Sequence, residues 1–270
     1  MKKSLLLATL LLATNFISAN LVFAAEPSAS TEDEAVIVNN HLKIVSKSKN
    51  EENPLLNYTI EATYPQMIGA PLSNAAKNFN QEINTLVTSE IEQFKNNVKR
   101  DLPHMKTLPE EVKHNTLHID YDVDVIHPEP LLLVSVRLNI EGMQAGRAHP
   151  YHAYRVLNFD LTHGKALALS DLFKPKTNYL KTLSKYSNKQ LNASLEDKWM
   201  ISKGAKPNPD NYKNWNIQAD SILITFDEYQ VAPYTNGPQE VEIPFAELKN
   251  IFSSQALIIS SAKDASSTVG

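Results

Sequence analysis

The residues that could support metal or acid–base chemistry are few and lie far apart in this chain. His149 and His152 are three positions apart, and His163 follows them. A zinc site needs further ligands at a characteristic spacing, or a helix that presents histidines and a glutamate on one face. Neither accompanies this histidine pair, so the pattern favours a structural role in a loop. We predict no metal site, and metal binding by His149 and His152 stays open as the alternative.

Two neighbouring carboxylates, Asp227 and Glu228, are the candidates for hydrolytic chemistry because they lie beside Tyr229. Paired carboxylates cleave glycosidic bonds, and such pairs need not be close in the sequence. A polar strand end is the simpler interpretation of this dipeptide. The chain has no cysteine, which excludes thiol catalysis, and it has no Gly-x-Ser-x-Gly motif. We therefore predict no catalytic residue and no cofactor.

Three aspartates, Asp120, Asp122 and Asp124, alternate with apolar residues between Leu117 and Val125. Carboxylates at this spacing share one face of a strand. A calcium loop wraps around its ion, whereas a flat strand does not. The pattern therefore predicts a solvent-facing strand surface rather than a cation site.

Two loops have the composition of recognition surfaces. The first follows an apolar strand at residues 222–226, turns at residues 236–238 and leads into a strand that ends at Pro244, which has no N–H to donate. The second, residues 146–150, joins two predicted strands and begins at Gly146, which permits a positive φ. Loops held on a rigid sheet often carry function. The first loop contains Tyr229, Pro233, Tyr234 and Gly237, and the second contains Gly146 and His149.

The elements that must position these loops form an α+β pattern. Apolar residues recur every three or four positions from Leu72 to Val98, which predicts a long amphipathic helix opened by Pro71. A second amphipathic helix is predicted at residues 177–195, and a short one at 245–252. Residues 203–214 contain two prolines and are predicted to be a loop.

Alternating apolar residues predict antiparallel strands around these helices. A hairpin is expected from residues 41–48 and 55–64, and a three-stranded meander from residues 117–161. Pairing Ile126 with Leu131 places the apolar residues of two meander strands on one face and Asp120 opposite Arg137. A further short strand is predicted at residues 215–217.

The beginning of the chain predicts export. A positive start and a largely apolar run to Val22 are followed by Val22-Phe23-Ala24, a suitable cleavage site, so residues 1–24 are a predicted signal peptide. An uncleaved membrane anchor is the alternative. No later apolar run approaches the roughly 18 residues of a membrane span. We expect a soluble protein of the periplasm or the cell exterior, with residues 25–39 as a flexible leader and 253–270 as a tail.

The charge balance is mildly acidic. The chain has 26 Lys and Arg residues against 30 Asp and Glu residues, for a formal net charge of −4. Nucleic-acid binding requires a basic surface, so that class of partner is not expected. A basic protein partner is compatible with this charge.

Several segments occur in the order and spacing of a known family. They include residues 146–150 (GRAHP), 169–173 (LSDLF), 226–234 (FDEYQVAPY) and Gly237-Pro238. Together they resemble the extracellular lysozyme-binding domain of the anti-sigma factor RsiV and the non-catalytic N-terminal module of the peptidoglycan deacetylase PdaC. The resemblance covers about residues 42–252.

The resemblance implies two fused halves, at residues 40–155 and 156–252, and a binding role. Carried over by motif, Tyr229, Pro233 and Tyr234 would lie in one contacting loop, with Gly237 at its end. Gly146 and His149 would lie in or near a second. The partner implied is lysozyme or a similar cell-wall hydrolase, and the alternative is a peptidoglycan- or glycan-binding protein. Simple packing of both tyrosines onto the sheet is the competing interpretation.

Overall fold

A computed structural model describes residues 35–128, 130–254 and 256 of the chain. The predicted signal peptide and most of the predicted leader and tail lie outside these residues. The end of the predicted leader is described, and it does not match that prediction. Val36–Ile37 forms a strand, β1, that pairs with the next strand, and Val38 is buried.

Seven strands form one sheet in the order β1-β2-β3-β4-β5-β6-β7. The neighbours are antiparallel except β3 and β4, which are parallel. The prediction of purely antiparallel sheets was therefore wrong at this pair, because a long helix joins β3 to β4 and brings the chain back to the same end of the sheet. The strands are β1 (Val36–Ile37), β2 (Leu42–Asn53), β3 (Tyr58–Gly69), β4 (Asn115–Ile126), β5 (Leu133–Met143), β6 (Tyr151–Asp160) and β7 (Lys165–Ala166).

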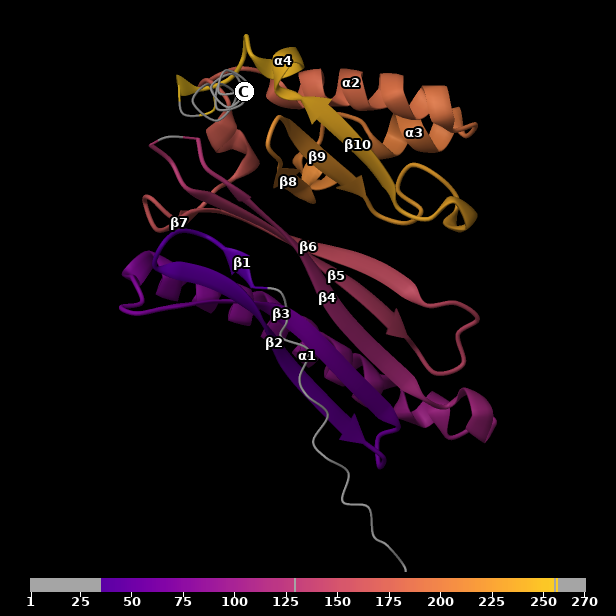
Figure 1. The fold of residues 1–270 in the computed structure, drawn as a ribbon. Helices are drawn as coiled ribbons and strands as arrows, with labels where there is room; N and C mark the ends of the chain where they lie inside the picture. The colour runs from indigo at the N-terminus through magenta and orange to yellow at the C-terminus, as the bar shows by residue number, and fades with distance from the viewer. Residues whose placement is uncertain (1–34, 129, 255, 257–270) are drawn as a thin grey trace, which may run out of the picture. The chain divides into compact units, whose positions relative to one another are not determined.

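The connecting helix α1 (Asn74–Met105) lies along one face of this sheet (Figure 1). Its apolar stripe shares one hydrophobic core with the strands. The helix begins after Ser73, whose hydroxyl accepts the Ala76 N–H at 3.1 Å. Ser73 is therefore the N-cap, and the prediction that Pro71 opens the helix was wrong by one turn. The buried apolar stripe consists of Ala76, Phe79, Ile83, Val87, Ile91, Phe94, Val98 and Met105.

The β4–β5 register differs from the predicted one by two residues. Ile126 pairs with Leu133 instead of Leu131, so Arg137 faces Asp122 rather than Asp120. A shift of two leaves every side chain on its predicted face because side chains alternate along a strand. The connection between the two strands accommodates this shift. The Leu131 N–H donates to the Pro128 carbonyl at 2.6 Å, and the Leu132 N–H donates to the Thr162 hydroxyl instead of to a neighbouring strand.

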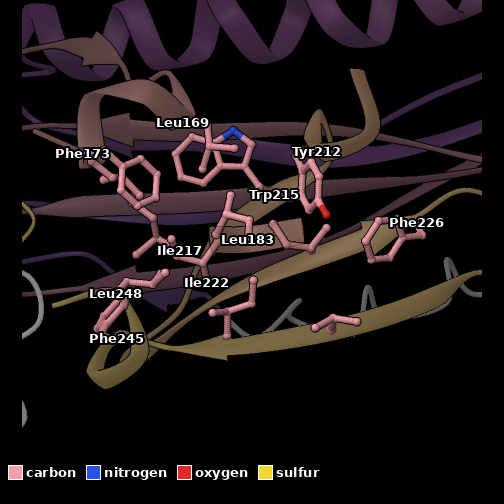
Figure 2. Close-up of a cluster of buried hydrophobic side chains, with 14 of the residues drawn as sticks. Leu169, Phe173, Leu183, Tyr212, Trp215, Ile217, Ile222, Phe226, Phe245 and Leu248 are labelled. Carbon is pink, nitrogen blue, oxygen red and sulfur yellow. The ribbon is translucent and has the colours of Figure 1, made fainter. Parts of the chain in front are cut away.

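A second sheet of three antiparallel strands has the order β10-β9-β8. It comprises β8 (Trp215–Ile217), β9 (Ser221–Phe226) and β10 (Gln239–Pro244), close to the predicted positions. Apolar side chains of this sheet and of helix α2 (Tyr179–Ser194) pack together in one hydrophobic cluster, part of which Figure 2 shows. The final helix, α4 (Phe245–Leu248), is shorter than predicted.

The region predicted to be a loop before β8 contains more structure than expected. Helix α3 (Lys198–Gly204) begins after Asp197, whose carboxylate accepts the Met200 N–H at 2.9 Å. Short 3₁₀ segments complete the described elements: η1 (Glu110–Val112), η2 (Leu169–Leu172), η3 (Pro209–Tyr212) and η4 (Tyr234–Asn236). Only Lys203 and Gly204 of α3 fall inside the predicted loop, and the rest of the helix was not predicted.

Buried polar side chains join the two sheets. The Asn158 amide of β6 donates to the Trp215 carbonyl at 2.8 Å and accepts the Ile217 N–H at 2.9 Å. The Asn216 amide of β8 donates to the Ser135 hydroxyl at 2.9 Å. The boundary predicted between residues 155 and 156 falls inside β6, and the described residues belong to one compact unit.

Candidate partner-binding surface

Three of the six predicted contact residues form an aromatic stack. His149 comes from the β5–β6 connection, and Tyr229 and Tyr234 come from the β9–β10 connection. The Tyr234 ring lies between the other two, with ring centroids 5.1 Å from His149 and 5.7 Å from Tyr229 and interplanar angles of 30°. The fold thus brings together two loops that are far apart in the sequence. We call these three residues the aromatic stack.

The two tyrosines of the stack have different environments. Tyr229 is 64% exposed, whereas Tyr234 is half-buried and its hydroxyl donates to the Pro150 carbonyl at 3.1 Å. Partial desolvation, followed by the negative charge of Glu228, raises the pKa of Tyr234. Tyr234 therefore packs one loop against the other, and Tyr229 is displayed to solvent.

The backbone of Tyr229 has a φ of 60°, in the left-handed region that non-glycine residues seldom occupy. The next residue fixes this conformation. The Gln230 amide donates to the carbonyls of Gly204 and Asn211 at 2.9 and 3.1 Å, and its oxygen accepts the Asp227 N–H at 3.0 Å. Because this loop is anchored on α3 and η3, the exposed Tyr229 ring projects from an ordered backbone.

Gly204 marks the closest approach between α3 and this loop. A Cβ at this position would lie 1.8 Å from the Gln230 carbonyl oxygen and 2.9 Å from a Val231 methyl group. The first of these atoms belongs to the backbone and cannot rotate away. The Tyr229 loop therefore depends on the absence of a side chain at Gly204.

Gly204→Ala should lower the free energy of unfolding by about 1–3 kcal/mol because of this overlap. A glycine-to-alanine replacement that caused no clash at the end of a helix would instead raise the free energy of unfolding by up to about 1 kcal/mol, because alanine has the higher helix propensity. Urea denaturation followed by circular dichroism measures the difference. Ser202→Ala in the same helix is the control and should change stability by less than about 0.5 kcal/mol. A more stable Gly204→Ala variant would contradict the close approach.

The two carboxylates considered for hydrolysis are engaged in structural contacts. Asp227 accepts from the Asn214 amide at 2.8 Å and pairs with Lys213 at 2.8 Å. The side chain of Glu228 is only 9% exposed and contacts the His152 Nδ1 at 2.6 Å. Both carboxylates hold the loop that carries Tyr229, and this arrangement favours positioning over catalysis.

The other three predicted contact residues lie outside the stack. Gly146 has a φ of 74° and donates its N–H to the Val112 carbonyl at 2.8 Å, and a Cβ there would lie 2.9 Å from Leu108. Pro233 is exposed and lines a cleft of about 470 Å³ beside residues 194–197. Gly237 has a φ of 64° and an open surrounding. Gly146 and Gly237 thus shape the two loops.

Sequence reasoning missed two features beside this surface. Trp199 of α3 is 67% exposed, with the Lys203 ammonium 4.9 Å from the centre of its ring. The second is the contact between Glu228 and His152, which connects the β9–β10 loop to the start of β6. The two residues are 76 positions apart, and no sequence pattern indicates that they meet. The Asp197 cap preceding Trp199 could have indicated α3.

The described residues contain no group of three or more histidine, cysteine, aspartate or glutamate side chains placed to hold a metal ion. No helix in the same part of the chain is long and apolar enough to cross a membrane.

Residues 170–246 match the family described as "Protein of unknown function (DUF3298)". The chain contains a DUF3298 domain. This domain includes α2, α3 and the three-stranded sheet, and hence the loop that carries Tyr229 and Tyr234. A crystal structure of a DUF3298 family member from Bacteroides fragilis superimposes with a TM-score of 0.56 at 20% identity, over 83% of this chain and 98% of that one. The predicted α+β fold is confirmed.

Two Bacillus subtilis proteins are homologous to this chain. Peptidoglycan-N-acetylmuramic acid deacetylase PdaC is 27% identical over 202 residues, which cover 74% of this chain and 39% of PdaC. Anti-sigma-V factor RsiV is 30% identical over 148 residues, covering 51% of this chain and 49% of RsiV. The resemblance inferred from the motifs is confirmed. The chain spans less than half the length of each relative.

Proposed function

We propose that this DUF3298 chain is a non-enzymatic, exported binding protein of the bacterial envelope that recognises lysozyme or a similar cell-wall hydrolase. The observation that carries the proposal is the aromatic stack, in which a half-buried Tyr234 supports an exposed Tyr229. Aromatic anchors of this kind supply much of the binding energy in protein interfaces. The homology to RsiV directs the choice of partner.

Three features support a binding role over catalysis. Tyrosine offers a large contact area with few rotatable bonds, so little entropy is lost when Tyr229 becomes buried in an interface. The acidic balance of the chain suits a basic partner, whose approach it accelerates. Asp227 and Glu228 are committed to Lys213, Asn214 and His152. Export rests on the signal peptide predicted at residues 1–24.

A lysis assay tests this function. Purified protein without residues 1–24 is added to lysozyme, and the clearing of a cell-wall suspension is followed by turbidity. We expect inhibition of clearing that saturates at one protein per lysozyme. Unchanged clearing at a tenfold excess of the protein would contradict the proposal.

Glycan binding is the second candidate, and one observation favours it. The name of the relative PdaC places that protein's action on peptidoglycan, and an exposed ring such as Tyr229 offers an apolar face to a sugar. Co-sedimentation with insoluble peptidoglycan separates the two candidates. Retention on peptidoglycan together with full lysozyme activity would support the second candidate and reject the first.

A further inference from the structure

An acidic cleft of about 510 Å³ lies between the two sheets, away from the aromatic stack. Strand β4 contributes Asp122 and Asp124, β5 contributes Arg137, and the three-stranded sheet contributes Asn216 and Glu240. Three carboxylates and one guanidinium give this acidic cleft a formal charge of −2. The alternating aspartates of β4 therefore face a partly enclosed space, and the prediction of a plain solvent-facing surface is incomplete.

The positive charge of Arg137 is already matched within the acidic cleft. Its guanidinium donates to the Asp122 carboxylate at 2.9 and 3.1 Å, to the Thr225 hydroxyl at 3.2 Å and to Glu240. Asp124, in contrast, has no hydrogen-bond or ion-pair partner among the described residues. Desolvation by the walls of the cleft, and secondly the charge of Asp122, raise the pKa of Asp124, while the charge of Arg137 acts in the opposite direction. Asp124 is exposed, and it is the carboxylate of the cleft that makes no direct ion pair in the described structure.

Asn216 provides a second, independent acceptor at the same place. The residue is 5% exposed and lines the acidic cleft. Its amide nitrogen donates to the Ser135 hydroxyl and to the Val136 carbonyl, at 2.9 and 3.0 Å. Because the Val136 carbonyl can only accept, the amide orientation is fixed. The Asn216 Oδ1 is a buried acceptor without a hydrogen-bond partner in the described structure. Such an orphaned acceptor is costly to keep unless a donor reaches it.

We infer that the acidic cleft receives a protonated amine, the side chain of a lysine on the bound protein, with Asp124 as counter-ion and Asn216 as hydrogen-bond acceptor. Both groups lack a donor, and an ammonium supplies three donors and a positive charge. A divalent metal ion fits less well because the Arg137 guanidinium lies among the carboxylates. The inference deepens the proposed function and rests on it for the identity of the partner.

The acidic cleft adjoins a second groove that leads toward the loop carrying Tyr229. This groove of about 330 Å³ shares Asp122 and Arg137 with the cleft and extends to His152. The His152 ring contacts Glu228, the residue that precedes Tyr229. A single protein partner can therefore cover Tyr229 and place a lysine in the cleft.

Butylammonium, a lysine side chain without its backbone, is the probe. The side-chain amide signals of Asn216 are followed by NMR while butylammonium is titrated into the protein. We expect a saturable shift that butanol, the neutral analogue, does not produce. Asp124→Asn should weaken the apparent affinity at least about tenfold, the effect of losing a charged hydrogen bond. Asp210→Asn, the same change at an exposed residue that lines neither the cleft nor the adjoining groove, should alter it less than about twofold.

The outcomes separate this inference from the proposed function. Equal weakening by Asp124→Asn and Asp210→Asn, an equal shift with butanol, or no shift at all would overturn the amine site, whatever lysozyme does. Circular dichroism melting confirms that both variants fold. If butylammonium binds as expected and lysozyme does not, the cleft stands and the proposed function fails. If lysozyme binds the wild type and Asp124→Asn equally well, a lysine in the cleft is excluded for that partner.

Discussion

Replacing Tyr229 by alanine is expected to weaken lysozyme binding about 30-fold or more, the loss of about 2 kcal/mol that marks an aromatic hot spot. The ring is 64% exposed and stacks on Tyr234, so truncation removes contact area that is available to a partner. The fold should be unaffected because alanine retains the Cβ at the same φ of 60° and no buried contact is lost. Calorimetric titration of lysozyme measures the effect.

A matched control distinguishes this surface from general hydrophobic contact. Leu55 is 93% exposed, in the turn between β2 and β3, and Leu55→Ala should leave the affinity within about twofold. Tyr234→Ala removes the support of the stack and its bond to Pro150, so it should weaken binding at least as much as Tyr229→Ala. Equal affinities for the wild type and both tyrosine variants would show that the partner binds elsewhere.

Asn158→Ala is expected to lower the free energy of unfolding by about 3 kcal/mol, the largest stability effect that we predict. Asn158 is 3% exposed, and its amide serves the Trp215 carbonyl, the Ile217 N–H and the Ser135 hydroxyl. Truncation leaves two backbone groups of β8 buried without partners, and each costs about 1–3 kcal/mol. The three-stranded sheet would lose its polar attachment to β6.

Urea denaturation monitored by tryptophan fluorescence is suitable because Trp215 itself accepts one of these bonds. Asn139→Ala provides the control, since Asn139 is half-exposed and its side-chain amide donates to the Asp122 carboxylate at 3.1 Å. Its effect should stay below about 1 kcal/mol. A loss of stability no greater for Asn158→Ala than for Asn139→Ala would contradict the role of this network.

Local patterns predicted much of the fold. The apolar stripe of α1, the alternation of β4 and β5 and the strands around the Tyr229 loop were all readable because each repeats with a helical or strand period. The β4–β5 register was not, because a shift of two preserves the faces and only the turn geometry at Leu131 decides it. The parallel pairing of β3 with β4 depends on where α1 ends in space, which no local pattern encodes.

The candidate surface shows a similar division. The composition of the two loops predicts Tyr229, Tyr234 and His149 as contact residues, but no local pattern indicates that the His149 and Tyr234 rings stack. Gly146 was chosen with them, and in the structure it packs near the end of α1, against Leu108. The contact of Glu228 with His152 joins two polar residues that are far apart in the sequence, so no periodic pattern of apolar residues indicates it. Local patterns thus indicated the loops, and the tertiary fold determined their pairing.

The most direct test of a protein-binding role is calorimetric titration of lysozyme into the protein lacking residues 1–24, at low and physiological salt. We predict one site per chain, a dissociation constant in the micromolar range or tighter, and weaker binding at higher salt because an acidic surface meets a basic partner. Absence of binding heat at both salt concentrations, with the protein shown to be folded, would contradict the proposal.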